Sequence, residues 1–430
     1  MNRTVRCCTR LRGDIKVPGD KSISHRSLMF NGIASGQARI RGLLNSEDVA
    51  STQRCLKALG VRFVTEGLDV RVHGRSGSLV QPQSALDCGN SGTTMRLLTG
   101  IIAGQSFDAE LIGDESLSSR PMSRVVDPLR LMGARIEGQQ DGKYAPLMIC
   151  GRRLTNQAFC SPVASAQVKS ALLLAGIAGQ GTQRVKEPHL SRDHTERMFA
   201  AMGCSIDTDP CSGELSMLGG QKLHCIDTEI PGDVSSAAFF MVAATVLEGS
   251  QLRLRDVGLN PTRTGIIDVL VQMGADLKIE SPRVVCGEPI GDIVVRSAPL
   301  RGVKISGEII PRIIDELPVL AVAASVAEGI TTVSDAAELR VKESDRISLT
   351  CEMLTAFGAK VEERPDGFTV EGVNSLVGGT VTSGGDHRIA MSGAVAGLLA
   401  RGETTVVGAE CMNVSFPGFI ECLGELREGP

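Results

Sequence analysis

One polar stretch leads directly into an apolar run over residues 27–34. It is Gly19-Asp20-Lys21-Ser22-Ile23-Ser24-His25-Arg26. Pro18 ends the extended segment before it, and either Asp20 or Ser22 is suited to cap a helix. The apolar residues that follow recur at helical spacing. The stretch therefore predicts the first turns of a helix.

Cations crowd the start of this predicted helix. A helix N-terminus carries unsatisfied N–H groups and partial positive charge, so Lys21 and Arg26 beside it predict an anion site. The site is not a P-loop, because Lys21 follows Asp20 rather than a glycine and the upstream glycine is missing. From these residues alone, a capped helix with a solvated basic first turn stays open as an alternative.

The composition predicts a globular protein of two or three domains. The chain has 430 residues, 42% hydrophobic and 22% charged, so a sizeable core is available. A net charge of -4 argues against a general nucleic-acid binder. Thirteen cysteines without a CxxC pair are interpreted as small core residues in a reducing cytoplasm. We expect neither a signal peptide nor a membrane span.

Two glycine signatures repeat along the chain at intervals of about seventy residues. In the first, a glycine follows an apolar helix end, where a positive φ is expected. In the second, a helix rich in small residues ends in a glycine before a new strand. The first signature contains Gly60, Gly133, Gly203, Gly274, Gly358 and, in a shorter form, Gly424; the second contains Gly36, Gly104, Gly179, Gly249, Gly329 and Gly402.

The interleaved signatures predict six units, each of a helix, a strand, a second helix and one or more further strands. Six such units are too many for one small core, so we predict an α/β protein of two domains with three units each. The expected domains are 19–232 and 1–18 plus 233–430, with the first strand pairing with the second half. A solenoid of short units is the structural alternative.

Polar residues gather at the starts of the glycine-ended helices. If the helices run the same way within each domain, their starts converge on an interdomain cleft that holds multiply charged anions. Arg26 and Arg388 are expected in first helical turns, where the helix dipole disfavours cations unless an anion is bound. The six starts are Lys21-Ser22 with Arg26, 89–94 with Arg96, 165–167 with Lys169, 232–236, Asp315-Glu316 and 385–388.

Two further segments add charge. Arg120 stands in a predicted loop, and residues 338–346 contain three cations and three acids. A solvated, salt-bridged helix start is one account of the second segment. The alternative is that Asp315 and Glu343 supply the paired acids of a proton-transfer reaction, beside cations that hold a phosphate.

Metal and nucleophile sites have little support. His189 and His194 do not have the i, i+4 spacing of a helical ligand pair, so both are expected to be surface polar residues. No G-x-S-x-G elbow is present, and Cys88 is expected to be a buried thiol.

The chain resembles the EPSP synthase family, the 3-phosphoshikimate 1-carboxyvinyltransferases. The segments that carry the resemblance are 19–26, 89–96, 120–133, 165–167, 231–236, 340–346, 386–391 and 415–417. The resemblance implies an inverse α/β barrel of two similar domains, each of three β-α-β-α-β-β units, with helix N-termini facing the cleft. It also implies transfer of the enolpyruvyl group from phosphoenolpyruvate to the 5-hydroxyl of shikimate 3-phosphate, without a metal or organic cofactor.

Site residues are carried over from the family's motifs. We hypothesise that Asp315 accepts the hydroxyl proton, that Glu343 handles the methylene proton and that Lys21 shares in proton transfer. The resemblance implies shikimate 3-phosphate contacts for Lys21, Ser22, Arg26, Ser165, Gln167, Asp315 and Lys342. It implies phosphoenolpyruvate contacts for Lys21, Gly92, Arg120, Gln167, Arg346 and Arg388.

The sequence departs from the family's pattern at three positions. Ala166 stands where some members have a second serine, Glu338 replaces a frequent asparagine, and Val414 stands where some have a phosphate-contacting lysine. These differences affect expected binding detail rather than the reaction. Gly92 is the position at which glyphosate crowds the family's phosphoenolpyruvate site, so competitive inhibition by glyphosate is expected.

Two other functions compete with this interpretation. A UDP-N-acetylglucosamine 1-carboxyvinyltransferase shares the repeat count but typically lacks the K-S-I-S-H-R start and uses a loop cysteine, where this chain has Ser118, Ser119 and Arg120. A non-enzymatic repeat scaffold predicts interchangeable helix starts, whereas these differ from unit to unit. We expect a cytoplasmic monomer that binds small-molecule substrates and neither nucleic acid nor membranes.

Overall fold

The computed structural model describes residues 1–67, 69–209 and 212–428, and the chain groups into two compact units. The N-terminal unit is Gly19–Ile230 together with Val284–Glu288. The C-terminal unit is Met1–Pro18, Pro231–Arg283 and Pro289–Pro430. No helix of the described residues is long and apolar enough to cross a membrane.

The sheets of the N-terminal unit repeat one pairing pattern. Their strands are β3 (Gln37–Arg41), β4 (Arg62–Glu66), β5 (Asp69–His73), β6 (Leu86–Asp87), β7 (Asp108–Ile112), β8 (Arg135–Gly138), β9 (Tyr144–Cys150), β10 (Ala158–Cys160), β11 (Thr182–Lys186), β12 (Asp207–Thr208), β13 (Leu215–Leu218) and β14 (Thr228–Glu229). In the sheet β14-β3-β5-β4 a parallel pair is followed by two antiparallel pairs. The sheets β6-β7-β9-β8 and β10-β11-β13-β12 pair in the same order of directions.

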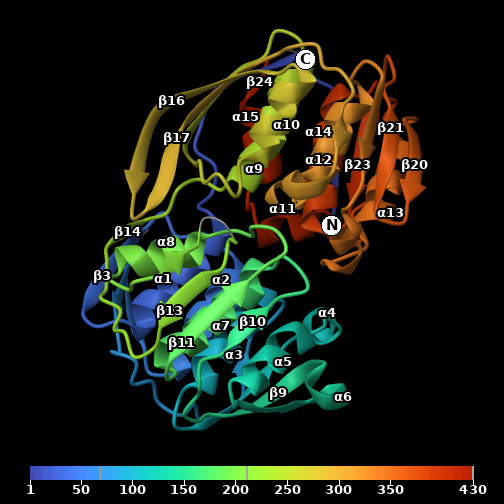
Figure 1. The fold of residues 1–430 in the computed structure, drawn as a ribbon. Helices are drawn as coiled ribbons and strands as arrows, with labels where there is room; N and C mark the ends of the chain where they lie inside the picture. The colour runs from blue at the N-terminus through green and yellow to red at the C-terminus, as the bar shows by residue number, and fades with distance from the viewer. Residues whose placement is uncertain (68, 210–211, 429–430) are drawn as a thin grey trace. The chain divides into compact units, whose positions relative to one another are not determined.

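The C-terminal unit repeats this pattern with strands from both ends of the chain. Its strands are β1 (Asn2–Arg6), β2 (Arg10–Ile15), β15 (Gln251–Gly258), β16 (Asp276–Val285), β17 (Glu288–Arg296), β18 (Lys304–Ile305), β19 (Ile330–Val333), β20 (Lys360–Arg364), β21 (Gly367–Glu371), β22 (Thr380–Thr382), β23 (Glu403–Val407) and β24 (Arg427–Glu428). The sheet β18-β19-β21-β20 has the parallel-then-antiparallel order. Strand β2 pairs in parallel with β15, and β1 pairs antiparallel with β23, so the N-terminus lies beside the red C-terminal elements (Figure 1).

Helices rich in small and apolar residues fill both cores. They are α1 (Lys21–Ile33), α3 (Gly92–Ala103) and α7 (Ala166–Ala178) in the N-terminal unit, and α9 (Val234–Val246), α12 (Leu317–Ser325) and α14 (His387–Leu399) in the C-terminal unit. Small residues let these helices approach closely, since a Cβ on Gly100 of α3 would lie 2.2 Å from the Ala171 carbonyl oxygen of α7.

The remaining helices pack around these six or join them. They are α2 (Glu47–Ala58), α4 (Glu115–Ser118), α5 (Ser123–Leu131), α6 (Gln139–Gly142), α8 (His194–Ala201), α10 (Gly265–Met273), α11 (Ile310–Ile313), α13 (Arg346–Ala356) and α15 (Phe419–Glu425), with 3-10 turns η1 (Gly307–Ile309), η2 (Ala337–Val341) and η3 (Ala409–Val414). The amphipathic helices α2, α5 and α10 bury one side and expose the other, as expected for an outer layer.

The predicted α/β class is confirmed, and the first glycine signature holds at all but one position. Gly60, Gly133, Gly203, Gly274 and Gly358 have φ between 74° and 106°. The prediction is wrong for Gly424, which lies inside α15 because that helix continues to Glu425.

The cysteines are only partly core residues. Cys8, Cys55, Cys88, Cys204 and Cys351 are buried, as the composition predicted. Cys7 and Cys160 are exposed, so the prediction is wrong for them, and Cys211 lies outside the described residues.

Candidate active site

The predicted start of α1 is the start observed. Asp20 is its N-cap, and its Oδ1 accepts a hydrogen bond from the Ile23 N–H at 2.8 Å. Lys21 is the first helical residue, and its Nζ lies 2.6 Å from Asp48 Oδ2 with both side chains partly accessible. This places a cation and an anion together at a helix N-terminus, where the dipole favours the carboxylate.

Arg26 lies one turn further along than expected. Because α1 begins at Lys21, Arg26 is in the second turn, but its Nη1 donates back to the Ser22 carbonyl at 3.1 Å. The side chain is buried, and its Nε and Nη2 donate to Thr195 Oγ1 at 2.8 Å and Ser170 Oγ at 2.7 Å. Burial lowers the pKa of Arg26 to about 10, so the guanidinium stays charged near pH 7.

Two arginines flank the first residue of α3. Ser91 caps this helix, accepting from the Thr94 N–H at 3.2 Å, and Gly92 follows it. A Cβ on Gly92 would lie 2.8 Å from Arg96 Nη1 and 3.7 Å from Arg120 Nη1. The missing side chain of Gly92 therefore leaves room for two guanidinium groups at one helix N-terminus.

The start of α7 is joined to the start of α3 by hydrogen bonds. Ser165 caps α7, as predicted. The Gln167 side chain accepts from Arg96 Nη1 at 2.7 Å and donates to Thr93 Oγ1 at 2.9 Å. We call Lys21, Ser22, Arg26, Gly92, Arg96, Arg120, Ser165 and Gln167 the N-terminal cluster.

The second group of predicted residues surrounds one arginine. Arg346 begins α13, and its side chain is 1% exposed. Its guanidinium lies 3.0 Å from Asp315 Oδ1, 2.6 Å from Glu343 Oε2 and 2.8 Å from Asp386 Oδ2. Burial alone lowers the pKa of Arg346, but these three carboxylates outweigh burial and raise it. The paired acids predicted from the sequence are thus held by a shared cation.

Arg388 lies in the first turn of α14, as predicted. The helix is capped by Asp386, which accepts from the Arg388 N–H at 2.9 Å. The Arg388 side chain donates to the Asp315 carbonyl at 3.0 Å, and it lies 3.7 Å from Glu316 Oε1. We call Asp315, Glu316, Glu343, Arg346, Asp386 and Arg388 the C-terminal cluster; Lys342 directly precedes Glu343 and follows η2.

Sequence patterns missed several partners of these residues. Thr93, Asp48 and Glu316 contact predicted site residues but had no assigned role. Thr93 and Glu316 lie within the predicted helix starts 89–94 and Asp315-Glu316, so their positions were the available signal. The expectation for His194 was wrong, since its Nδ1 lies 2.8 Å from Glu288 Oε1 with both side chains buried, whereas His189 is exposed.

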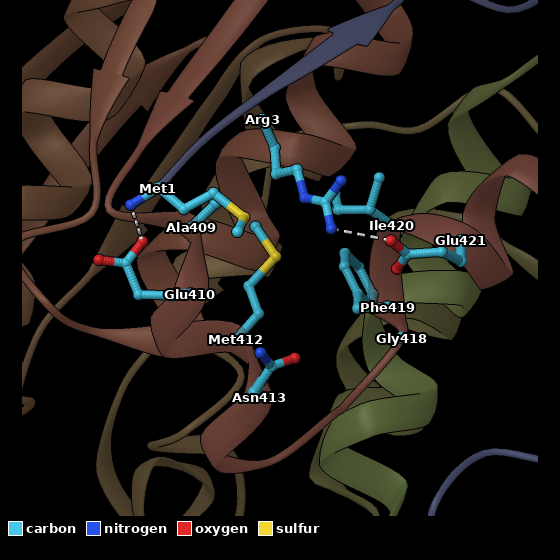
Figure 2. A pocket seen from close by; sticks show the side chains of 10 residues that line it. All are labelled: Met1, Arg3, Ala409, Glu410, Met412, Asn413, Gly418, Phe419, Ile420 and Glu421. Carbon is cyan, nitrogen blue, oxygen red and sulfur yellow. Dashed lines mark hydrogen bonds and ion pairs between the residues drawn. The ribbon is translucent and has the colours of Figure 1, made fainter.

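A small pocket in the C-terminal unit does not involve the predicted residues. Figure 2 shows it between the N-terminus and the end of the chain, with the Met1 ammonium paired to Glu410 and Arg3 paired to Glu421. Its volume of about 30 Å³ accommodates roughly one water molecule. Within the described residues, no group of three or more His, Cys, Asp or Glu side chains is placed to hold a metal ion.

The fold is that of the enolpyruvyl transferases. The enolpyruvyl transferase NikO from Streptomyces tendae matches 98% of the chain with a TM-score of 0.79 at 19% identity, which shows the shared fold. A solved EPSP synthase from Acinetobacter baumannii matches 99% of the chain and 98% of its own, with a TM-score of 0.89 and 43% identity.

The sequence comparisons specify the family. The family model for EPSP synthase (3-phosphoshikimate 1-carboxyvinyltransferase) matches residues 5–423. The 3-phosphoshikimate 1-carboxyvinyltransferases of Geobacter sp. (strain M21) and Geobacter metallireducens are 53% and 52% identical, each over 98% of both chains. The chain therefore belongs to the EPSP synthase family, and it is a transferase of the shikimate pathway.

Proposed function

We propose that this chain transfers the enolpyruvyl group of phosphoenolpyruvate to the 5-hydroxyl of shikimate 3-phosphate and releases phosphate. Membership of the family supports the reaction. The observation that carries the proposal is that the two terminal nitrogens of the buried Arg346 guanidinium bind different acids. Nη1 donates to Asp315, and Nη2 donates to Glu343. That arrangement supplies two acids for proton transfer and a cation for an anionic substrate.

Binding is assigned to the two clusters by the charge of the substrates. Both substrates carry several negative charges, so they require clustered cations and helix N-termini. We assign shikimate 3-phosphate to Lys21, Ser22, Arg26, Ser165, Gln167, Asp315 and Lys342. We assign phosphoenolpyruvate to Lys21, Gly92, Arg120, Gln167, Arg346 and Arg388.

Asp315 is the proposed base. Its ion pair with Arg346 stabilises the ionised carboxylate, which is the form that accepts the hydroxyl proton. Glu343 handles the methylene proton, and Lys21 shares in proton transfer. The hydroxyl oxygen bonds to the enol carbon while the methylene carbon takes a proton and becomes a methyl group. The tetrahedral intermediate then loses phosphate and one proton of that methyl group, and the double bond re-forms.

The deciding experiment measures phosphate release from phosphoenolpyruvate with shikimate 3-phosphate, run beside UDP-N-acetylglucosamine. Release with the shikimate ester alone supports the proposal, and release only with the nucleotide sugar contradicts it. Asp315→Ala should abolish turnover while shikimate 3-phosphate binding stays measurable by calorimetry. An active Asp315→Ala variant would remove Asp315 as the base.

Three finer properties belong to the same proposal. We propose inhibition by glyphosate that competes with phosphoenolpyruvate, because a glycine stands at position 92, where glyphosate crowds the family's phosphoenolpyruvate site. Kinetics without such competition would contradict it. We also propose a cytoplasmic monomer. Light scattering of the purified chain tests the monomer, and cell fractionation tests the compartment.

A further inference from the structure

Two pairs of adjacent residues meet between α7 and α8 of the N-terminal unit. Lys169-Ser170 lies on α7, and Thr195-Glu196 lies on α8. The hydroxyl oxygens of Ser170 and Thr195 are 2.6 Å apart, and Lys169 Nζ lies 2.7 Å from Glu196 Oε1. One helix–helix contact therefore carries a hydroxyl pair and a buried ion pair side by side.

The hydroxyl pair holds the guanidinium of Arg26. Nε donates to Thr195 and Nη2 donates to Ser170, while Nη1 donates to the Ser22 carbonyl. All three acceptors are uncharged oxygens, although the carboxylate of Glu196 is close enough to act on the charge of Arg26. A buried arginine whose hydrogen bonds go to neutral oxygens can form a charge-assisted hydrogen bond with a bound anion.

Lys169 pairs with two carboxylates, Glu187 and Glu196, and Glu196 also acts on the charge of Arg26. The Lys169 side chain is 3% exposed, and Nζ lies 3.1 Å from Glu187 Oε2 as well as 2.7 Å from Glu196 Oε1. Burial alone lowers the pKa of Lys169, but Glu196 and Glu187 outweigh it and raise the pKa. Glu187 also accepts a hydrogen bond from the Ser165 N–H at 2.7 Å, so Lys169 acts on the cap of α7 too.

We propose that Lys169 is a positioning residue for the acceptor substrate: it neutralises Glu187 and Glu196 and thereby leaves the Arg26 guanidinium to bind an anionic group of shikimate 3-phosphate. This inference rests on the proposed function. Without Lys169, the Glu196 carboxylate, which acts on the charge of Arg26 more strongly than Asp20 or Glu288 does, loses its cation and competes with the substrate for Arg26.

The test titrates shikimate 3-phosphate by calorimetry and follows phosphate release in three variants. Lys169→Met keeps most of the length of the side chain and removes its charge. It should raise the Kd and KM for shikimate 3-phosphate about tenfold or more, the equivalent of one charge-assisted hydrogen bond. Its kcat and its KM for phosphoenolpyruvate should change less than about threefold.

The matched variants separate charge from packing. Glu196→Gln keeps the shape of the side chain and should bind shikimate 3-phosphate at least as tightly as the unchanged chain. Lys169→Met combined with Glu196→Gln should restore Kd to within about threefold. A packing role predicts weaker binding in every variant.

The outcomes distinguish failure of the role proposed for Lys169 from failure of the proposed function. An unaltered Kd in Lys169→Met, or weaker binding in Glu196→Gln, overturns the role of Lys169. Should Lys169→Met fail to fold, the direction of the Glu196→Gln effect decides alone. Absence of phosphate release from the unchanged chain contradicts the proposed function instead.

Discussion

His25 should make the folded chain sensitive to mild acid. It is fully buried, and its Nδ1 lies 2.7 Å from Thr52 Oγ1. Burial lowers the pKa of His25 from 6.5 to about 3, with Lys21 and Arg26 acting in the same direction and Asp48 opposing them. His25 therefore becomes protonated below about pH 6.5 in the unfolded chain but only near pH 3 in the folded chain. The stability that His25 contributes is complete above pH 6.5 and is lost as pH falls toward 3.

The linkage relation gives the magnitude. With these two pKa values, lowering the pH from 7 to 5 costs about 2 kcal/mol from this one side chain. The measurement is urea unfolding followed by far-UV circular dichroism, since the chain has no Trp and one Tyr. His25→Gln cannot take up the proton, so its free energy of unfolding should fall by about 2 kcal/mol less over the same range.

The control is the exposed His189. His189→Gln should show the same pH dependence as the unchanged chain. Equal pH slopes for the unchanged chain and His25→Gln between pH 7 and pH 5 would refute the argument, because they would mean that His25 is protonated as easily in the folded chain as in the unfolded one.

Four substitutions test other parts of the structure. Gly92→Ala places a methyl 2.8 Å from Arg96 Nη1, so the KM for phosphoenolpyruvate should rise about tenfold in the phosphate-release assay. Gly100→Ala meets a backbone oxygen at 2.2 Å and should lower the free energy of unfolding by about 2 kcal/mol. Gly424→Ala has open space around the added methyl inside α15 and should raise the free energy of unfolding by up to about 1 kcal/mol. Asp386→Asn removes a buried charge 2.8 Å from Arg346 and should cost about 3 kcal/mol in urea unfolding at pH 7.

The helix starts could be predicted because capping is local. Asp20, Ser91, Ser165, Asp233 and Asp386 each accept a hydrogen bond from an N–H two or three residues ahead in the chain. Such bonds depend only on neighbouring residues, so the residue type and the apolar spacing after it are sufficient.

The long-range partners could not be predicted in this way. The sequence predicts a surface position for His194, and this prediction is wrong because its buried partner, Glu288, lies 94 positions away and no local pattern marks the pair. Glu196 likewise pairs with Lys169 across two helices. The prediction for Gly424 was wrong for a different reason. A glycine after apolar helical residues usually ends a helix, but α15 continues past it to Glu425.

Arg26 and Arg346 are both buried but are held in different ways, and we propose that they act differently on the substrates. Within the described residues, the hydrogen bonds of the Arg26 side chain go to neutral oxygens, so an anionic group of a substrate would gain a full charge interaction there, and changes near Arg26 should appear in KM. Arg346 already faces Asp315, Glu343 and Asp386, so an anionic substrate must compete with a carboxylate there. Glu343 is the most exposed of the three, with a side chain 33% accessible, and it is the one a substrate displaces most readily. In the proposed mechanism, a carboxylate that loses its cation beside a bound anion takes up a proton more easily, and Glu343 would then change from a partner of Arg346 into the proton donor for the methylene carbon.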